Sequence, residues 1–465
     1  MRKRSKLYSL LSIVLALTLF MSACSGGGTA TPPEAEPTNT AVEETNNQQE
    51  EPKEEEPAPE PEEVVIDMQG KPIRVMSWGN PFGQEGTDLG ETLIALENEM
   101  STKHNTKFEF VEATWDNIVE KVTTSVMAGE PIADVFYLEK ARAIPGMINS
   151  DFLTPISDFI DLDDPKWPVK LKEVAGYDGK VYGFATDISG GAGIFYNRAI
   201  LKKEGLTDPH ELLDKGEWTW DAFLDIAKKV TKDTDGDGKL DQYGVAIDAV
   251  SFTRSTIASN GADLTKVENG NLVYDAENPA AMEALRFFSD LYHVHNVVKP
   301  NVDGNWDDYI NSFNQGNVAM RYGEFWEGGG IKENLGNEYG FIYFPKGPQA
   351  TDHVSSTTNL SLFWVPKGAN EDAVKLFIDY LFAGKMPEGE VSPYLEEQFA
   401  DEKSLEINLN TSDNIHIPDY IGIPDFEATI RQTWNNIGAG KETPETGMAK
   451  VRPVLEGLLK ASEKK

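Results

Sequence analysis

The sequence predicts an α/β protein in which strands and helices alternate. Two stretches carry this prediction: strand-like and helix-like segments follow one another from Ile73 to Leu138, and residues 179–231 have the pattern strand, loop, strand and helix. Length adds a third argument, because 465 residues with 40% apolar content can bury more than one core. We therefore expect two or more domains.

The N-terminus has the pattern of a signal peptide over residues 1–23. Basic residues precede the apolar run 7–21, which is too short to cross a membrane as a helix. Cys24, the only cysteine, follows Ser22 and Ala23. This spacing resembles a bacterial lipobox, in which the cysteine is acylated, for example with palmitate, and becomes the mature N-terminus. The alternative is an unmodified cysteine in a discarded leader. We expect a lipid anchor that holds the protein on the extracytoplasmic face of the cell membrane.

The following segment, residues 24–63, is predicted to be an unfolded tether. Residues 25–63 contain twelve Glu and one Lys among many Pro, Thr, Asn and Gln, so they cannot bury enough apolar surface to fold. The formal net charge of the whole chain is −35, which repels phosphate backbones and anionic lipid surfaces. We therefore expect no nucleic-acid partner and favour a neutral or cationic ligand.

The first part of the chain after the tether is predicted to alternate strictly between strands and helices. Strands 73–78, 108–111 and 133–138 are separated by helices 90–104 and 115–128. Such alternation implies parallel strands with helical crossovers. Ligands of these sheets lie beyond the carboxyl ends of the strands. The residues at these ends are Trp78 and the segment from Tyr137 through Glu139 to Lys140.

Residues 179–231 are the most informative stretch. Val181–Ala185 and Ile194–Tyr196 are strand-like, a Ser-Gly-Gly loop lies between them, and Thr219 is a good N-cap for a helix with one apolar face. The later pattern predicts helices 279–295, 305–314, 372–381 and 448–459, a helix containing Phe426, and strands 318–322, 341–344 and 360–365.

The segments of this stretch resemble those of a known protein family. The sequence GKVYGFATD, followed by IFYNRAIL and WTWDAFLDIAKKVT, is similar to the signature of family 1 extracellular solute-binding proteins, the maltose-binding-like receptors of ABC importers. The segments AGEPIADVFYLEKARAIPGMINSDFLTPISDFI and GNVAMRYGEFWEGG and a strand followed by Pro-Lys-Gly continue the resemblance in family order, over nearly all of residues 70–460.

The resemblance implies a periplasmic-binding-protein-like fold. It has two lobes, each a central β-sheet flanked by helices, joined by hinge crossings. Residues 64–186 and 360–412 would form the first lobe, and residues 187–359 and 413–465 the second. The run 179–231 would then contain the first crossing.

The resemblance also implies a function. The protein would capture a small ligand, most simply an oligosaccharide, between its lobes and deliver it to the membrane permeases of an ABC importer. We expect it to act as a monomer and not as an enzyme. Trp326 matches the tryptophan with which family members stack on a sugar ring. The other expected ligand residues are Trp78, Tyr137 and Asp187, with Glu139 and Glu324 as polar partners. Trp306 is better explained by core packing, whereas Phe426, Glu427 and Trp434 fit core and cleft equally.

An acidic loop, KDTDGDGKLDQYG, follows the helix that Thr219 begins. Asp233, Asp235 and Asp237 alternate like positions 1, 3 and 5 of a calcium-binding loop. Gly238 takes the position of the sharp turn. Lys239 and Asp241 take positions 7 and 9, but position 12 is glycine, so the bidentate glutamate is missing. We expect a structural Ca²⁺ site here, and a solvated acidic turn is the alternative.

Three other functions remain open from the residues alone. A secreted carbohydrate-active enzyme would need two carboxylates placed across a sugar, and with 77 acidic residues their presence decides nothing. Motifs of nucleophilic, metal or phosphate chemistry are absent from the sequence, including G-x-S-x-G, H-E-x-x-H and the P-loop. A binding protein for a non-sugar solute and a lipid-tethered adhesin are the second and third alternatives.

Overall fold

The computed structural model describes residues 65–188, 191–269, 271–301, 307–387 and 390–462. The chain divides between Glu63 and Val64, where the folded part was expected to begin. The expected signal peptide, the tether and Cys24 therefore lie outside the described residues. Within the described part, every helix is too short or too polar to cross a membrane.

The first sheet has the strand order β2-β1-β3-β14-β6. Strand β1 pairs in parallel with β2 and β3, as the sequence predicted, and β14 runs antiparallel to both β3 and β6. The strands are β1 (Ile73–Ser77), β2 (Phe108–Glu112), β3 (Val135–Glu139), β6 (Gly183–Phe184) and β14 (Ser361–Trp364). The helices of this group are α1 (Asp88–His104), α2 (Ile118–Met127), α3 (Lys140–Ala143), α4 (Gly146–Asn149), α5 (Leu171–Val174) and α13 (Glu371–Ala383), with the short hairpin β4 (Gly176–Tyr177) and β5 (Lys180–Val181).

The second sheet has the strand order β12-β7-β11-β8. Only β8 and β11 are parallel, while β7 runs antiparallel to β11 and β12. The strands are β7 (Ala192–Asn197), β8 (Tyr243–Ala246), β11 (Val318–Glu324) and β12 (Tyr339–Ile342). Its longer helices are α8 (Trp220–Val230), α9 (Ala249–Ser259), α10 (Pro279–His293), α15 (Glu402–Asn410), α16 (Phe426–Gly438) and α17 (Pro444–Ser462). Shorter elements are α6 (Arg198–Lys203), α7 (Pro209–Asp214), α11 (Asp308–Asn314), α12 (Gly328–Leu335), α14 (Pro393–Glu397) and the hairpin β9 (Thr265–Glu268) and β10 (Asn271–Tyr274).

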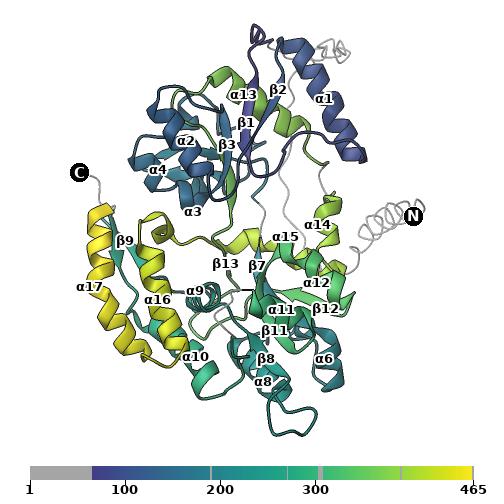
Figure 1. The fold of residues 1–465 in the computed structure, drawn as a ribbon, viewed down its shortest axis with the longest axis vertical. Coiled ribbons are helices and arrows are strands. Elements are labelled where there is room, and N and C mark those ends of the chain that lie inside the picture. Colours follow the sequence, from purple (N-terminus) through teal and green to yellow (C-terminus); the bar gives the residue numbers. More distant parts are fainter. Residues whose placement is uncertain (1–64, 189–190, 270, 302–306, 388–389, 463–465) are drawn as a thin grey trace, which may run out of the picture. The chain divides into compact units, whose positions relative to one another are not determined.

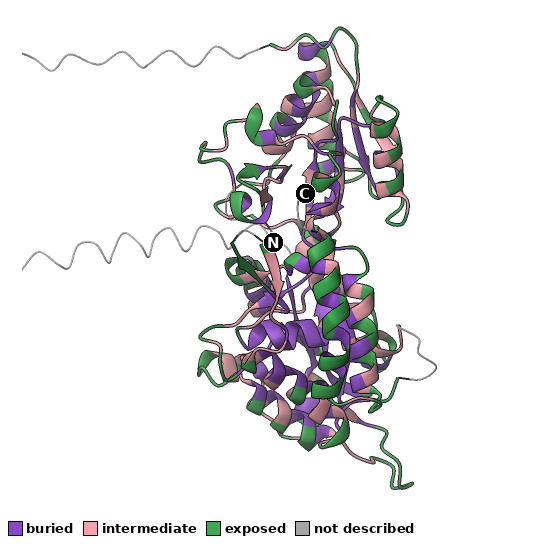
Figure 2. Ribbon diagram, turned by 90° about the vertical axis from the view of Figure 1, so that its left-hand side faces the viewer, coloured by how far each residue is buried: buried purple, intermediate pink, exposed green. Residues whose placement is uncertain are grey.

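Each sheet has its own hydrophobic core, and Figure 1 shows the two groups of elements. Phe136, Phe184 and Trp364 are fully buried in the first core, and Phe195 and Trp218 in the second. All residues of β7 and β11 are buried, so these two strands form the centre of the second core. Figure 2 shows that buried residues gather inside the groups of elements and exposed residues on the outer sides of the helices. Two separate cores explain why the chain has two lobes, because each sheet buries its apolar faces against its own helices.

Residues 393–411 correct one expected boundary. We placed residues 360–412 in the first lobe, but Phe399 and Ile407 belong to the second core, and Leu395 and Leu405 pack against it. Asp401, the N-cap of α15, lies 2.7 Å from Arg198 Nη1 and holds this segment to the second lobe. The chain therefore returns to the second lobe after α13 and not at residue 412.

Helix starts were predicted well where a capping residue marks them. Thr219 caps α8, and its side chain accepts a hydrogen bond from the main-chain N–H of Ala222. The expected helix from Trp115 instead begins at Ile118, because Trp115 to Asn117 form a turn after β2. This three-residue difference changes the position of an exposed aromatic side chain.

Candidate ligand-binding site

The connections between the two sheets define where a shared site can form. β14 begins at Ser361, opposite Glu139 at the end of β3, and β7 begins at Ala192, opposite Glu324 at the end of β11. The segments that lead into β7 and into β14 therefore join the two sheets at the edges where their parallel strands end. These carboxyl edges are where open α/β sheets bind ligands.

The edge of the first sheet carries a group of aromatic residues. Trp78 directly follows β1, and its ring centroid lies 5.3 Å from that of Tyr137 in β3. Tyr137 in turn lies 4.9 Å from Phe363 of β14, between centroids. Burial raises the pKa of the Tyr137 phenol, so it stays a neutral hydroxyl at physiological pH. Two predicted ligand residues, Trp78 and Tyr137, are thus brought together.

Glu139 lies at the same edge but its carboxylate has partners within the protein. The indole N–H of Trp115 donates to Glu139 Oε1, and Arg142 Nη1 lies 3.4 Å from Glu139 Oε2. The Arg142 guanidinium stacks 4.1 Å above the centroid of the Trp115 ring, and its Nη2 donates to the Trp115 carbonyl at 2.9 Å. Glu139 therefore positions Trp115, an aromatic residue that sequence reasoning did not select.

Trp115 is held firmly and yet is 54% exposed. One face of its indole is covered by the Arg142 guanidinium, and its N–H is already bonded. A sugar ring needs such a flat apolar surface, which loses little entropy on binding because it is fixed beforehand. The sequence signal was the place of Trp115, three residues after the end of β2.

The edge of the second sheet carries Trp326. Its ring is 48% exposed and belongs to a short 3₁₀ turn, η3 (Phe325–Glu327), at the end of β11. The main-chain N–H of Phe325 donates to the Gly191 carbonyl at 3.0 Å, so this turn contacts the start of the crossing into β7. Trp326 is therefore exposed beside the hinge.

Glu324, the predicted polar partner, is buried beneath the turn. Its carboxylate accepts hydrogen bonds from Tyr322 Oη at 2.8 Å and Thr357 Oγ1 at 2.9 Å. Burial raises the pKa of Glu324 to about 7, although the bonds from Tyr322 and Thr357 act in the opposite direction. Glu327 completes the turn, since its Oε1 accepts from the Glu324 N–H at 2.8 Å and its Oε2 lies 2.7 Å from Arg321 Nη2.

The other residues that the sequence singled out are not part of the two aromatic edges. Asp187 is exposed on a cavity of about 520 Å³ that Pro81, Tyr380 and Lys385 also line. Phe426 and Trp434 are fully buried in the second core, as the packing interpretation predicted. Glu427 forms ion pairs with Arg254 and Arg431. Trp306 lies outside the described residues.

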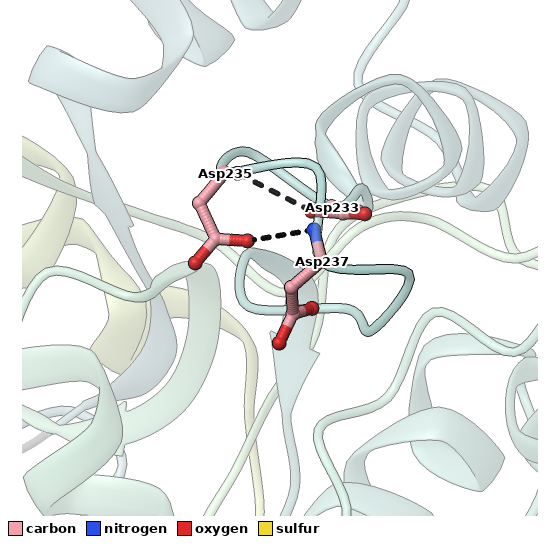
Figure 3. A group of neighbouring side chains, drawn as sticks. All are labelled: Asp233, Asp235 and Asp237. Carbon is pink, nitrogen blue, oxygen red and sulfur yellow. Dashed lines mark hydrogen bonds between the residues drawn. The ribbon is translucent and has the colours of Figure 1, made fainter.

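The acidic loop brings three carboxylates together, as Figure 3 shows. One carboxylate oxygen of each of Asp233, Asp235 and Asp237 lies within 4.8 Å of the others. Hydrogen bonds from the N–H groups of Gly238 and Gly236 lower the pKa of Asp233. The carboxylate of Asp241 already accepts from the N–H and the hydroxyl of Thr234, at 3.0 and 2.8 Å. The donor set fits a hard cation that prefers oxygen, such as Ca²⁺, although Asp241 is engaged.

The family of the chain follows from comparison with known proteins. Residues 85–384 match the family model of bacterial extracellular solute-binding proteins. Because this match covers more than half of the chain, the protein belongs to that family. One curated relative is the arabinooligosaccharide-binding protein of Halalkalibacterium halodurans, 24% identical over 256 residues, which are 55% of this chain and 54% of the relative. The chain thus spans about half the length of the curated relative it matches.

Solved structures share the fold. The cyclic alpha-maltosyl-1,6-maltose binding protein from Arthrobacter globiformis superposes with a TM-score of 0.65 at 15% identity, over 84% of this chain and 99% of that one. An ABC substrate-binding protein from Listeria monocytogenes in complex with cycloalternan gives a TM-score of 0.60 at 17% identity, over 84% and 99%. These similarities show the two-lobed, periplasmic-binding-protein-like fold.

Proposed function

We propose that this protein is a receptor that captures a small oligosaccharide between its two sheet edges and delivers it to an ABC importer. The observation that carries the proposal is the distribution of tryptophan. Among the described residues, the exposed tryptophans are Trp78, Trp115 and Trp326. Trp78 and Trp115 follow the carboxyl ends of β1 and β2, and Trp326 follows the end of β11 beside the crossing into β7. The other described tryptophans are buried.

Exposed aromatic rings at these places favour a sugar over other solutes. Each ring offers a flat apolar face to the C–H face of a sugar, worth about 1 kcal/mol beyond the buried area. The relative and the two structures named above bind oligosaccharides according to their names, which supports the same ligand class here. A ligand that touches both edges would favour the closed form of the hinge by its differential affinity.

The test is a thermal melting screen of residues 64–465 against oligosaccharides of arabinose, glucose and mannose, and against amino acids, peptides and polyamines. A bound sugar at a hundred times its Kd stabilises the folded state by about 2.7 kcal/mol, which raises the midpoint by degrees. If only a non-sugar class raises the midpoint, the protein binds another solute. Release of reducing sugar in the same wells would support the enzyme alternative instead.

We propose further that the receptor is a monomer held to the membrane through acylated Cys24. The lipobox-like spacing supports this anchor, and the acidic residues 25–63 would keep the folded part away from the lipid surface. Replacing Cys24 with Ser should release the protein into the medium, as fractionation and immunoblotting would detect. Retention of that variant in the membrane fraction would contradict the anchor.

We also propose that the acidic loop binds a structural Ca²⁺. The three neighbouring carboxylates support it, although main-chain N–H groups of the loop already donate to oxygens of all three. Like charges so close together repel one another unless a cation lies among them. Calcium should raise the melting midpoint, EGTA should reverse the rise, and Asp235→Ala should abolish it. A melting midpoint that changes with neither calcium nor EGTA would mean that the loop is only a solvated acidic turn.

A further inference from the structure

Glu324 connects the Trp326 turn to a crossing segment between the sheets. Its carboxylate accepts from Thr357 Oγ1, and Thr357 follows strand β13 (Ser355–Ser356), which pairs with β15 (Ile415–His416) between the two cores. On the other side, Glu324 and Glu327 are arranged as a capping box around the turn that carries Trp326. One buried carboxylate thus contacts both the ligand edge and the hinge.

The Tyr322 hydroxyl has one proton to donate and two hydrogen-bond acceptors within reach. Its oxygen lies 2.8 Å from Glu324 Oε1 and 3.1 Å from the Ser356 carbonyl oxygen. While Glu324 is ionised, its charge attracts the Tyr322 proton, because hydrogen bonds to charged groups are the stronger ones. When Glu324 is protonated, it can donate to the Tyr322 oxygen instead. Tyr322 then donates to the Ser356 carbonyl.

We propose that Glu324 is a positioning residue whose protonation moves a hydrogen bond of Tyr322 between the Trp326 turn and crossing strand β13. Ionised Glu324 holds the turn and leaves Ser356 with the weaker donor Ser255, whose Oγ is 3.4 Å away. Protonated Glu324 ties β13 to β11 through Tyr322. Thr357 Oγ1 lies 2.9 and 3.1 Å from the two carboxyl oxygens of Glu324, so it keeps an acceptor in both states and Tyr322 carries the difference. The switch exists without ligand, whereas its effect on sugar affinity rests on the function proposed above.

The surroundings place this change near neutral pH. Burial is the main cause that raises the pKa of Glu324, and the charge of Glu327 adds to it, while Arg254 on α9 opposes it. On the hinge side, His416 Nδ1 lies 3.1 Å from Ser356 Oγ, and its Nε2 lies 2.9 Å from Asp263 Oδ2. The charged and titratable groups that face Glu324 or its hydrogen-bonded neighbours are Tyr322, Tyr309, Glu327, Arg321, Arg254 and His416. Tyr420 and Glu427 in turn face Arg254, and Asp263 faces His416.

The first test needs no ligand. Hydrogen exchange of the amides in residues 355–359 is measured at pH 6 and pH 8, corrected for intrinsic exchange, in the wild type, Glu324→Gln and Glu333→Gln. Glu333 is an exposed residue of α12 and controls for the loss of one charge. In the wild type, exchange should be about threefold faster at pH 8, the size of one ordinary hydrogen bond. Glu324→Gln should show the slow rate at both pH values, because its amide donates to Tyr322 as the protonated acid does.

A second variant keeps the test informative if the first unfolds. Tyr322→Phe removes the shared hydroxyl and should make exchange in 355–359 independent of pH while Glu324 remains. A pH response that persists in Glu324→Gln or Tyr322→Phe, or that also disappears in Glu333→Gln, would overturn the proposal.

The second test joins the switch to binding. Arabinotriose affinity is measured by calorimetry at pH 6 and pH 8 in the same variants. The wild type should bind about threefold tighter at pH 8, where the turn that carries Trp326 is held by the charged carboxylate, and Glu324→Gln should bind equally at both pH values. A pH-independent wild type would overturn this coupling. Absence of arabinotriose binding would contradict only an arabinose-containing ligand, and the exchange experiment would still decide the switch.

Discussion

The two sheet edges expose aromatic residues in different ways. At the first edge, Trp115 is held by Glu139, which is buried, and by Arg142, whose guanidinium is partly exposed and covers one face of the ring. At the second, the turn of Trp326 rests on Glu324 and Arg321, which are buried, and on Glu327, whose side chain is 8% exposed. Charges near water can be changed at little cost in folding, whereas buried charges depend on their partners. Mutations at the first edge should therefore change the ligand affinity, whereas mutations at the second edge should change both the affinity and the free energy of unfolding.

The largest effect is expected at the buried ion pair of the second edge. Glu327→Ala leaves the guanidinium of Arg321, a fully buried side chain, without its 2.7 Å partner. The free energy of unfolding should fall by about 3–5 kcal/mol, as is usual when one member of a buried pair is removed. Urea unfolding measures this loss, and the double variant Arg321→Met/Glu327→Ala should recover most of it. A loss below about 1 kcal/mol in the single variant would show that the pair is not buried in solution.

The next effect concerns pH and Glu324. Its pKa is about 7 in the folded state against 4.5 as the reference, so the folded state binds the proton more tightly. Stability is therefore highest below pH 4.5 and is lost as the pH rises towards 7, by about 3 kcal/mol in total for this group. Because other carboxylates titrate too, the informative quantity is the difference between Glu324→Gln and the wild type. This difference should grow in favour of the variant from pH 4.5 to 8, and a constant difference would contradict a raised pKa.

A smaller effect is expected at the first edge, and in binding alone. Trp115→Ala should lower the affinity for the sugar that raises the melting midpoint most. We expect binding to be about tenfold weaker, because one stacking face is lost. Its stability should change by less than about 1 kcal/mol, since the side chain is more exposed than buried. Tyr394→Ala is a suitable control, because Tyr394 is 57% exposed and belongs to helix α14, not to the end of a sheet strand. Equal weakening by both variants would remove Trp115 from the site.

The smallest effect is expected for Glu139→Gln. The amide oxygen can still accept from the Trp115 indole, but the charge that faces Arg142 is lost. Calorimetry should show affinity reduced by about two- to threefold, which corresponds to a partly exposed ion pair. An effect as large as that of Trp115→Ala would mean that Glu139 itself contacts the sugar.

Much of the fold could be predicted because the evidence was local. Neighbouring residues mark the strands predicted at 73–78 and 133–138 and found at Ile73–Ser77 and Val135–Glu139. They also mark the Thr219 cap and the strand before Trp326. Residues 393–411 were assigned to the wrong lobe because their position depends on distant contacts such as Asp401 with Arg198. The burial of Glu324 has the same origin, since Thr357 approaches it from 33 residues away. Trp115 was missed because its turn was taken for the first residues of a helix.

The most direct test of the account is whether one sugar needs both edges. Calorimetry of the best sugar from the melting screen compares the wild type with Trp78→Ala and Trp326→Ala, one from each lobe. We predict that each variant binds about tenfold more weakly, with the fold intact by circular dichroism. Unchanged affinity in either variant would contradict a ligand held between the two sheets.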